Sequence, residues 1–340
     1  MFKNLTLSRD IAIDLGTATV LVYVQDKGIV AKEPSVVAID TATDKIIKVG
    51  KEAQQMIGRT PDNIITMRPL KDGVINQYEV TFKMLQYFIR RSCQNTILAP
   101  RLMISIPSKM SEVEQRAILD AAAEAGARKT FLIESPIAAA IGAGLNIDTP
   151  VGNMIVDIGG GVTEIAVISL GGIVVSKTLK IGGDHFDEAI VQYVRDNYGI
   201  LIGERTAENV KIKIGDVYEH EEAKIVEVKG RDLSLGMPKV VNLSSKEMIG
   251  ATFSPMTALI DGICEMIEQT PPELVGDILH NGIALCGGGS QLKGLDKLIE
   301  RVTGINTYVA NNPTSCVALG MGKRLASMSR HPDPEKSNGT

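Results

Sequence analysis

Apolar residues along the chain follow two spacings, and these predict alternating strands and helices. Short apolar runs between polar or glycine-containing segments, such as residues 101–107 and 282–286, are typical of buried strands. In residues 78–91 the apolar side chains instead recur at helical spacing, at Val80, Met84, Leu85, Phe88 and Ile89. Strands that alternate with helices in this way indicate an α/β fold class.

Two serines mark the starts of predicted helices. Ser111 and Ser244 are each followed three residues later by a glutamate, Glu114 or Glu247, and this spacing predicts a capping box. The second of these helices is predicted to run toward residue 269. Pro255 lies inside it, so we expect a kink or a restart there, because proline cannot continue the hydrogen bonding of a helix interior.

Residues 154–169 (MIVDIGGGVTEIAVIS) predict a strand, a tight turn and a returning strand. An apolar run leads into Asp157, and three glycines at 159–161 precede a second apolar run. Glycines let the backbone take positive φ, and their N–H groups can approach an anion closely. Asp157, at the strand end, is placed to hold a hydrated cation beside that anion. Taken alone, the segment could equally be an ordinary glycine-rich hairpin.

Residues 9–24 (RDIAIDLGTATVLVYV) repeat the same pattern. Asp14 aligns with Asp157 and Gly16 aligns with Gly159, and the apolar positions before each aspartate also correspond. The two hairpins lie about one domain length apart along the chain, and a repeat on that scale predicts two similar lobes. Two such loops facing each other could hold the phosphates and the metal of a nucleotide from both sides, so the pair is far more specific than either loop.

Composition excludes several classes of protein. The 340 residues suit two domains, and 44% apolar with 22% charged residues is ordinary for a globular chain. A net charge of −4 gives no general reason to expect nucleic-acid binding, and the absence of Trp argues against base-stacking surfaces. The four cysteines are scattered without a CxxC pair, so we expect reduced thiols and neither a disulfide framework nor a zinc site.

No apolar run is long enough to span a bilayer, and residues 1–7 are too short for a signal peptide. These features predict a soluble or, at most, peripheral protein.

Together with the two hairpins, residues 134–140 (ESPIAAA) and 285–290 (LCGGGS) make the chain resemble the actin/Hsp70/sugar-kinase superfamily. Within it, the chain is most similar to the MreB family of bacterial actin homologues. The stretches that carry this closer resemblance are residues 27–38, 56–61, 68–75 and 202–208. The resemblance covers roughly residues 9–328.

The resemblance implies an actin-like fold, a duplicated ribonuclease H-like architecture of two α/β lobes around a nucleotide cleft. The first lobe is expected at 1–147 with an inserted subdomain at about 33–70, and the second at 148–316 with an inserted subdomain at about 182–243. A closing helix, 317–328, is expected to return to the first lobe. Residues 329–340 are polar with two prolines, and we expect a disordered tail.

The resemblance also implies a site for ATP or GTP with Mg²⁺. Asp14 and Asp157 would hold the metal through water. Glu208 and Lys211 match the helix that meets the ribose and base, although alone they could be a solvated helix face. The remaining implied nucleotide contacts are Gly16, Thr17, Ala18 and Thr19 in the first loop, Gly159, Gly160, Gly161 and Thr163 in the second, and Gly287, Gly288, Gly289 and Ser290 in the adenosine loop.

Two positions depart from the family pattern. Ser135 stands before the motif proline, where MreB and Hsp70 proteins carry a glutamate that orients the attacking water, and Val162 replaces a threonine of the second loop. Glu134 is the remaining candidate for a catalytic carboxylate, but neighbouring strand side chains face opposite sides. Either Glu134 or Glu164 is still sufficient to position the attacking water, or hydrolysis is slow. We favour slow hydrolysis, because both changes affect one task.

By this resemblance, the chain forms homopolymeric filaments tuned by nucleotide that support bacterial cell shape, with related filament subunits as further partners. Ile97 and Leu98 lie where MreB-like proteins carry an apolar insertion, and Met1, Phe2, Leu5 and Leu7 add a short apolar N-terminus. We therefore expect a cytoplasmic protein, peripheral on the inner face of the membrane. A sugar-type kinase is the alternative, but no catalytic aspartate motif for one is found. An Hsp70-like binding module would need a substrate-binding domain, and none follows residue 328.

Overall fold

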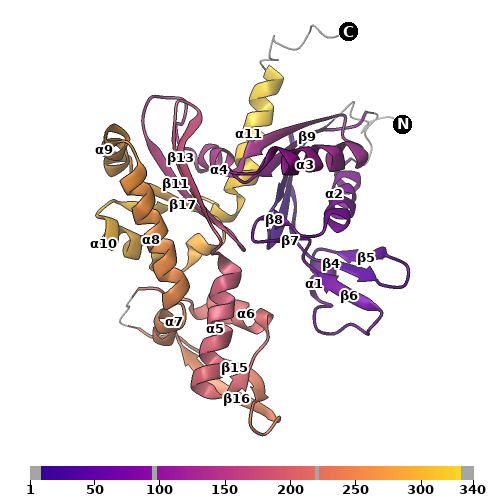
Figure 1. Ribbon diagram of the computed structural model, residues 1–340, viewed down its shortest axis with the longest axis vertical. Coiled ribbons are helices and arrows are strands. Elements are labelled where there is room, and N and C mark those ends of the chain that lie inside the picture. The colour runs from indigo at the N-terminus through magenta and orange to yellow at the C-terminus, as the bar shows by residue number, and fades with distance from the viewer. Residues whose placement is uncertain (1–8, 94–97, 219–221, 331–340) are drawn as a thin grey trace. The chain divides into compact units, whose positions relative to one another are not determined.

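The computed structural model describes residues 9–93, 98–218 and 222–330, and it divides into two compact units (Figure 1). Unit 1 comprises Met1–Asn146 together with Ser315–Thr340, and unit 2 comprises Ile147–Thr314. The predicted tail lies outside the described residues from residue 331 onward, as do Met1, Phe2, Leu5 and Leu7. No helix of the described part is long and apolar enough to cross a membrane.

Unit 1 is built on a five-stranded sheet in the order β10-β9-β1-β2-β3. β1, β2 and β3 form an antiparallel meander, while β9 and β10 run parallel to β1. The strands are β1 (Asp10–Leu15), β2 (Thr19–Val24), β3 (Gly28–Pro34), β9 (Arg101–Ile106) and β10 (Lys129–Glu134).

Helices of unit 1 cover both faces of this sheet, because alternate strand residues are apolar on each face. Ile11 and Ile13 share a buried core with α2 (Tyr78–Ser92) and α3 (Glu112–Glu124). α4 (Ser135–Ala143) and α11 (Cys316–Arg330) pack together, and α11 also contacts β1, β2 and β9.

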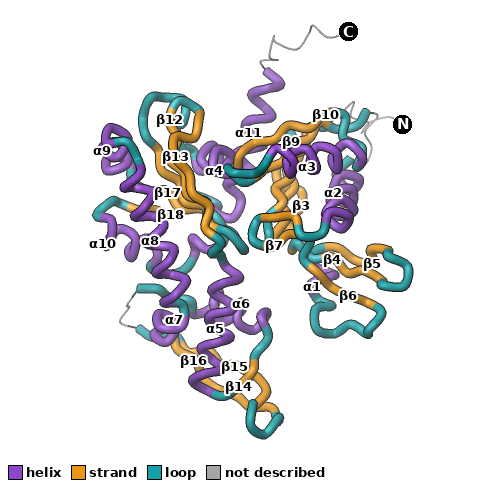
Figure 2. Tube along the Cα trace, viewed as in Figure 1, coloured by secondary structure: helices purple, strands orange, loops and turns teal. Residues whose placement is uncertain are grey.

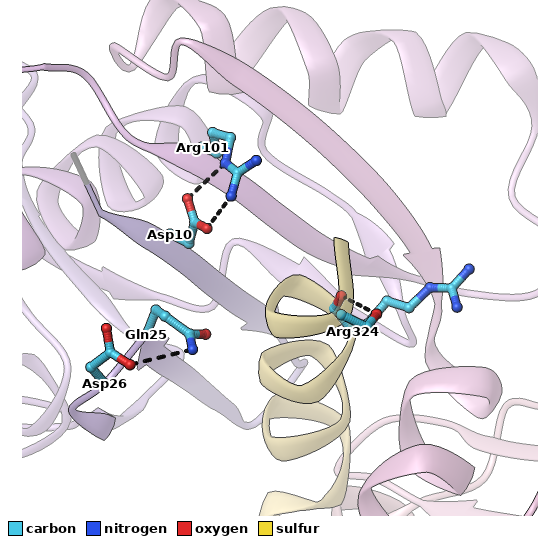
Figure 3. A network of polar contacts seen from close by, with 6 residues as sticks. Asp10, Gln25, Asp26, Arg101 and Arg324 are labelled. Carbon is cyan, nitrogen blue, oxygen red and sulfur yellow. Dashed lines mark hydrogen bonds and ion pairs between the residues drawn. The ribbon is translucent and has the colours of Figure 1, made fainter. Parts of the chain in front are cut away.

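A bidentate ion pair joins the first residues of β1 and β9 (Figure 3). Arg101 Nε donates to Asp10 Oδ1 at 2.8 Å, and the second guanidinium nitrogen contacts Oδ2. Figure 3 also shows Gln25 donating to Asp26, in the turn between β2 and β3. The planar guanidinium matches a carboxylate in this geometry, so the pair helps to set the register of the parallel strands.

A small three-stranded sheet, β5-β4-β6, is inserted in unit 1 after β3. It consists of β4 (Val37–Asp40), β5 (Lys45–Val49) and β6 (Ile64–Met67), with α1 (Lys51–Gln54) packed on it. The short hairpin of β7 (Leu70–Lys71) and β8 (Val74–Ile75) follows and leads into α2.

Unit 2 repeats the plan of unit 1. Its five-stranded sheet has the order β13-β12-β11-β17-β18, again with an antiparallel meander on one side and parallel strands on the other. The duplicated two-lobe architecture predicted from the repeated hairpins is therefore confirmed. The strands are β11 (Asn153–Ile158), β12 (Thr163–Ser169), β13 (Gly172–Leu179), β17 (Ile283–Cys286) and β18 (Thr307–Val309).

A second small sheet in unit 2 lies beside α5 (Gly183–Tyr198) and α6 (Glu204–Ile214), as Figure 2 shows. Its strands are β14 (Ile200–Leu201), β15 (Ile225–Asp232) and β16 (Pro238–Ser244). α8 (Phe253–Gln269) packs on the large sheet, with α9 (Pro272–Asn281) and α10 (Leu295–Thr303) completing the unit. The short turns η1 (Gly289–Gln291) and η2 (Pro313–Ser315) are 3-10 helices.

The helix predicted to start at Ser244 restarts, as the proline indicated. It forms α7 (Ser245–Ala251) and then α8, with Thr252 between them. Pro255 is the third residue of α8, where the backbone N–H would have no partner within the helix. The break therefore precedes the proline and leaves it in a first turn, which tolerates it.

Candidate nucleotide-binding site

The first predicted phosphate loop connects β1 to β2 in unit 1. The Gly16 N–H donates to the Thr19 carbonyl at 3.1 Å and closes the turn. A Cβ at position 16 would lie 2.7 Å from that carbonyl oxygen, so the turn requires glycine through close approach. Thr17 is buried, and its hydroxyl accepts from the Gly73 N–H at 3.1 Å, which ties the loop to the β7–β8 turn.

Asp14 is held in place by a residue that the sequence reasoning missed. Ser105 on the neighbouring strand β9 donates from Oγ to Asp14 Oδ1 at 2.8 Å. Burial raises the pKa of Asp14 to about 6, while the hydrogen bond from Ser105 opposes that rise. A bound cation near this buried carboxyl group would lower its pKa and favour the ionised form, so the position suits a cation site.

The second predicted phosphate loop, between β11 and β12 in unit 2, closes by the same hydrogen bond as the first. The Gly159 N–H donates to the Val162 carbonyl at 2.9 Å, and Gly159 occupies the position that corresponds to Gly16. The duplication thus extends from the sequence to the turn geometry. Because the Gly159 N–H is used within the turn, any phosphate contact of this loop depends on its other N–H groups.

The glycines at 159–161 would allow positive φ, but the loop does not use it. Neither Gly16 nor residues 159–161 adopt it. A Cβ at 159 would instead lie 3.0 Å from the Val162 carbonyl oxygen, so the turn leaves little space there. Thr163 is fully buried, and its hydroxyl donates to the Ile181 carbonyl at 2.7 Å, which anchors the loop to the segment between β13 and α5.

Asp157 has an acidic neighbour across the hairpin. In the antiparallel register Asp157 lies opposite Glu164, so both carboxylates project from the same face of the sheet. Glu164 is 4% exposed. The Asp157 side chain also lies against Gly287, where a Cβ would come within 2.5 Å of Oδ1.

The donor chemistry of these residues fits Mg²⁺ held through water. No group of three or more His, Cys, Asp or Glu side chains within the described ranges could hold a metal ion directly. Mg²⁺ usually keeps several waters and uses one or two carboxylates together with substrate phosphates. Within its own unit, each of Asp14 and Asp157 is a carboxylate of the kind that such a hydrated ion uses.

Lys211 does not lie on a solvated helix face. Its ammonium donates to the Gly183 carbonyl at 2.6 Å and to Asp187 Oδ2 at 2.8 Å. These bonds use two of its three N–H groups. Glu208, one turn earlier on α6, is half-buried. Asp187 was missed by sequence reasoning, and it lies one turn after the start of α5.

The predicted adenosine loop follows β17 and is a closely packed turn. Gly287 has φ +79°, and a Cβ there would lie 2.3 Å from the Ile158 carbonyl oxygen. Ser290 is buried and donates from Oγ to the Gly287 carbonyl at 2.8 Å. Within unit 2 this loop therefore packs through Gly287 and Gly289 against Ile158 at the end of β11, where the second phosphate loop begins, whereas a Cβ at Gly288 would meet nothing within 4 Å.

The residues expected to position water occupy different environments. Glu134 ends β10 at the N-cap position of α4, where its side chain makes no capping hydrogen bond, and burial raises its pKa. Ser135 is the first residue of α4, and its hydroxyl donates to the Ile106 carbonyl at 3.1 Å. Val162 is half-buried in the second loop. The Ser135 proton is therefore engaged by backbone.

Of the two residues predicted to contact a membrane, Ile97 lies outside the described residues. The Leu98 side chain is exposed.

Comparison with known proteins decides the family. The family model described as "MreB/Mbl protein" matches residues 8–332. The chain belongs to the MreB/Mbl family. It is 50% identical over 330 residues to the cell shape-determining protein MreB of Escherichia coli strain K12, covering 95% of each chain.

Solved structures of this family share the fold. A crystal structure of MreB5 of Spiroplasma citri bound to ADP superimposes with a TM-score of 0.92 at 37% identity, covering 96% of this chain and 99% of that one. A structure of MreB5 bound to AMPPNP gives 0.91, also at 37% identity, with 96% and 98% covered. The actin-like fold class expected from the sequence is confirmed. The names of these relatives support a cytoskeletal protein and give no support to the kinase alternative.

Proposed function

We propose that this chain is an ATP-binding subunit of a cytoskeletal filament that supports bacterial cell shape. The observation that carries the proposal is the pair of Asp-turn loops, closed by the same hydrogen bond from Gly16 and from Gly159. In this proposal, each of the two loops binds nucleotide phosphate. The relatives support this, because MreB of Escherichia coli is named cell shape-determining and MreB5 structures hold ADP or AMPPNP.

Mg²⁺ accompanies the nucleotide in this proposal, and it neutralises phosphate charge when bound. Asp14 and Asp157 hold its water shell, and Ser105 keeps the Asp14 carboxylate oriented. Backbone N–H groups of the loops hold the phosphates, while Glu208, Lys211 and the loop 287–290 hold the nucleoside. The adenine nucleotides in the MreB5 structures favour ATP over GTP.

Hydrolysis is slow in this proposal. Ser135 has no carboxylate and donates its proton to backbone, and Val162 has no hydroxyl with which to orient water. Glu134 is the candidate base that remains. Slowly hydrolysing filaments stay loaded with ATP, so their disassembly depends on a partner or a related subunit. The filament is cytoplasmic and peripheral on the inner face of the membrane, held by Ile97, Leu98 and the apolar N-terminus.

The nucleotide assignment is tested by titration calorimetry of Mg-ATP with the wild type and Asp157→Ala. Removing the carboxylate should weaken Mg-ATP binding by about tenfold or more, since a hydrogen bond to a charged group is worth about 1.5–3 kcal/mol. Glu265→Gln is the control, because Glu265 pairs with Lys177 on another part of unit 2. Equal affinity of Asp157→Ala and wild type would refute the assignment.

Assembly is tested separately from binding. The wild type should pellet with Mg-ATP and should transfer no phosphate to sugars. Phosphotransfer without pelleting would instead favour the kinase alternative.

A further inference from the structure

A chain of hydrogen bonds joins α6 to the second phosphate loop through the start of α5. The Lys211 ammonium on α6 donates to the Gly183 carbonyl at 2.6 Å. The Gly183 N–H in turn donates to the Gly159 carbonyl at 2.9 Å, and the Asp184 N–H donates to the Gly160 carbonyl at 2.8 Å. The lysine is thus connected to two loop carbonyls through the first peptide groups of α5.

The start of α5 comes this close to the loop only because it carries glycine. A Cβ at Gly182 would lie 2.5 Å from the Gly160 carbonyl oxygen. A Cβ at Gly183 would lie 3.2 Å from Lys211 Nζ. A contact of this kind moves the loop and the helix together, since neither can shift without breaking hydrogen bonds.

Asp187 holds the other end of the chain. Its Oδ2 accepts from Lys211 at 2.8 Å, and the Asp187 and Lys211 side chains are only 9% and 14% exposed. Among the described residues no group donates to its second oxygen, Oδ1. A buried ion pair is weak evidence for stability, because desolvating two charges opposes their attraction. α5 and α6 already share an apolar core that includes Ile190 and Val210.

We propose that Asp187 is a positioning residue for the nucleotide site. It holds the Lys211 ammonium on the Gly183 carbonyl and thereby fixes the second phosphate loop in the geometry that accepts phosphate. This inference rests on the proposed function, since it assigns a role at the same site. It also makes nucleotide binding and the position of α6 depend on each other, because coupling between two sites is reciprocal.

For the Asp187–Lys211 pair, the expected pH dependence of nucleotide affinity differs from that of stability, and this difference distinguishes a positioning role from a stabilising one. Burial raises the pKa of Asp187 to about 7, with Lys211 opposing the rise and Glu208 and Asp184 adding to it. Because the folded protein binds this proton more tightly than the unfolded chain, the Asp187 contribution to stability falls as pH rises from about 4 to about 7. Nucleotide affinity should change in the opposite direction, because the ionised carboxylate holds Lys211 more firmly.

The test is a double-mutant cycle on the full chain, with Mg-ADP as the probe in titration calorimetry. Asp187→Asn should weaken Mg-ADP binding by about tenfold, the value of one charge-assisted hydrogen bond, and Lys211→Met should weaken it by at least as much, because Lys211 also holds the nucleoside in the proposed function. The double variant should bind Mg-ADP no more weakly than the single variant of lower affinity, because both changes interrupt the same chain of hydrogen bonds. Glu265→Gln is the matched control, since it removes an ion pair elsewhere in unit 2.

Three results would overturn the inference: additive losses in the double variant, wild-type affinity in Asp187→Asn, or a wild-type pH profile between pH 6 and 8 that Asp187→Asn reproduces. If Asp187→Asn alone fails to fold, Lys211→Met and the double variant remain, and they must bind Mg-ADP equally. A wild type that binds no Mg-ADP would instead contradict the proposed function itself.

Discussion

At the scale of single residues, two side chains determine how fast the bound nucleotide should turn over. Ser135 donates its proton to the Ile106 carbonyl, and Val162 offers no hydroxyl. Ser135→Glu with Val162→Thr should raise steady-state phosphate release more than tenfold, since general-base assistance is typically worth about 10²–10⁴-fold. ATP affinity should barely change. A phosphate-release time course on assembled protein measures the rate, and equal rates for wild type and variant would assign the base role to Glu134 or Glu164.

The sequence predicted the site residues that a local motif places. It did not predict the residues that come close only because separate strands or helices pack together. Asp14 and Asp157 stand at the ends of strands in a repeated pattern, so their placement follows from the chain itself. Ser105 reaches Asp14 only because β9 lies parallel to β1, and Asp187 reaches Lys211 only because α5 packs on α6. No spacing in the sequence encodes these pairings.

At the scale of elements, α4 and α11 pack so closely that their contact requires glycine. A Cβ at Gly320 on α11 would lie 1.8 Å from the Ala138 carbonyl oxygen on α4. Gly320→Ala should therefore lower the free energy of unfolding by about 1–3 kcal/mol, as overpacking typically does. Gly276→Ala on α9 is the control, because nothing lies within 4 Å of its Cβ and alanine favours a helix by about 1 kcal/mol. Thermal unfolding should move in opposite directions for the two variants, and a stabilised Gly320→Ala would contradict this packing.

Element starts were predictable where a local signal exists. Ser111 and Glu114 form the capping box of α3 as expected, and Pro255 falls in a first turn after a restart. The conformation of the loop glycines was not predictable, because glycine serves both positive φ and close approach, and a sequence does not distinguish the two. At Gly16 and Gly159 close approach is the observed reason.

At the scale of the whole molecule, membrane attachment should depend on assembly. Fully burying two side chains such as Ile97 and Leu98 would gain at most about 3–6 kcal/mol. Losing translational and rotational freedom on association opposes this by at least about 4 kcal/mol. A single subunit should therefore bind a bilayer marginally. In a filament the contributions of many subunits combine, because each further contact is effectively intramolecular.

Liposome co-sedimentation at matched polymer mass tests this dependence. Wild-type filaments should carry vesicles into the pellet, whereas Ile97→Ser/Leu98→Ser filaments should pellet largely without lipid and leave the vesicles in the supernatant. Leu170→Ser is the control, since Leu170 is 69% exposed in the β12–β13 turn of unit 2 and has no expected role at the membrane. Unassembled wild type should bind vesicles far less than filaments do. If the double variant pellets with lipid as well as the wild type and Leu170→Ser, residues 97–98 are not the anchor, and the apolar N-terminus becomes the segment to change next.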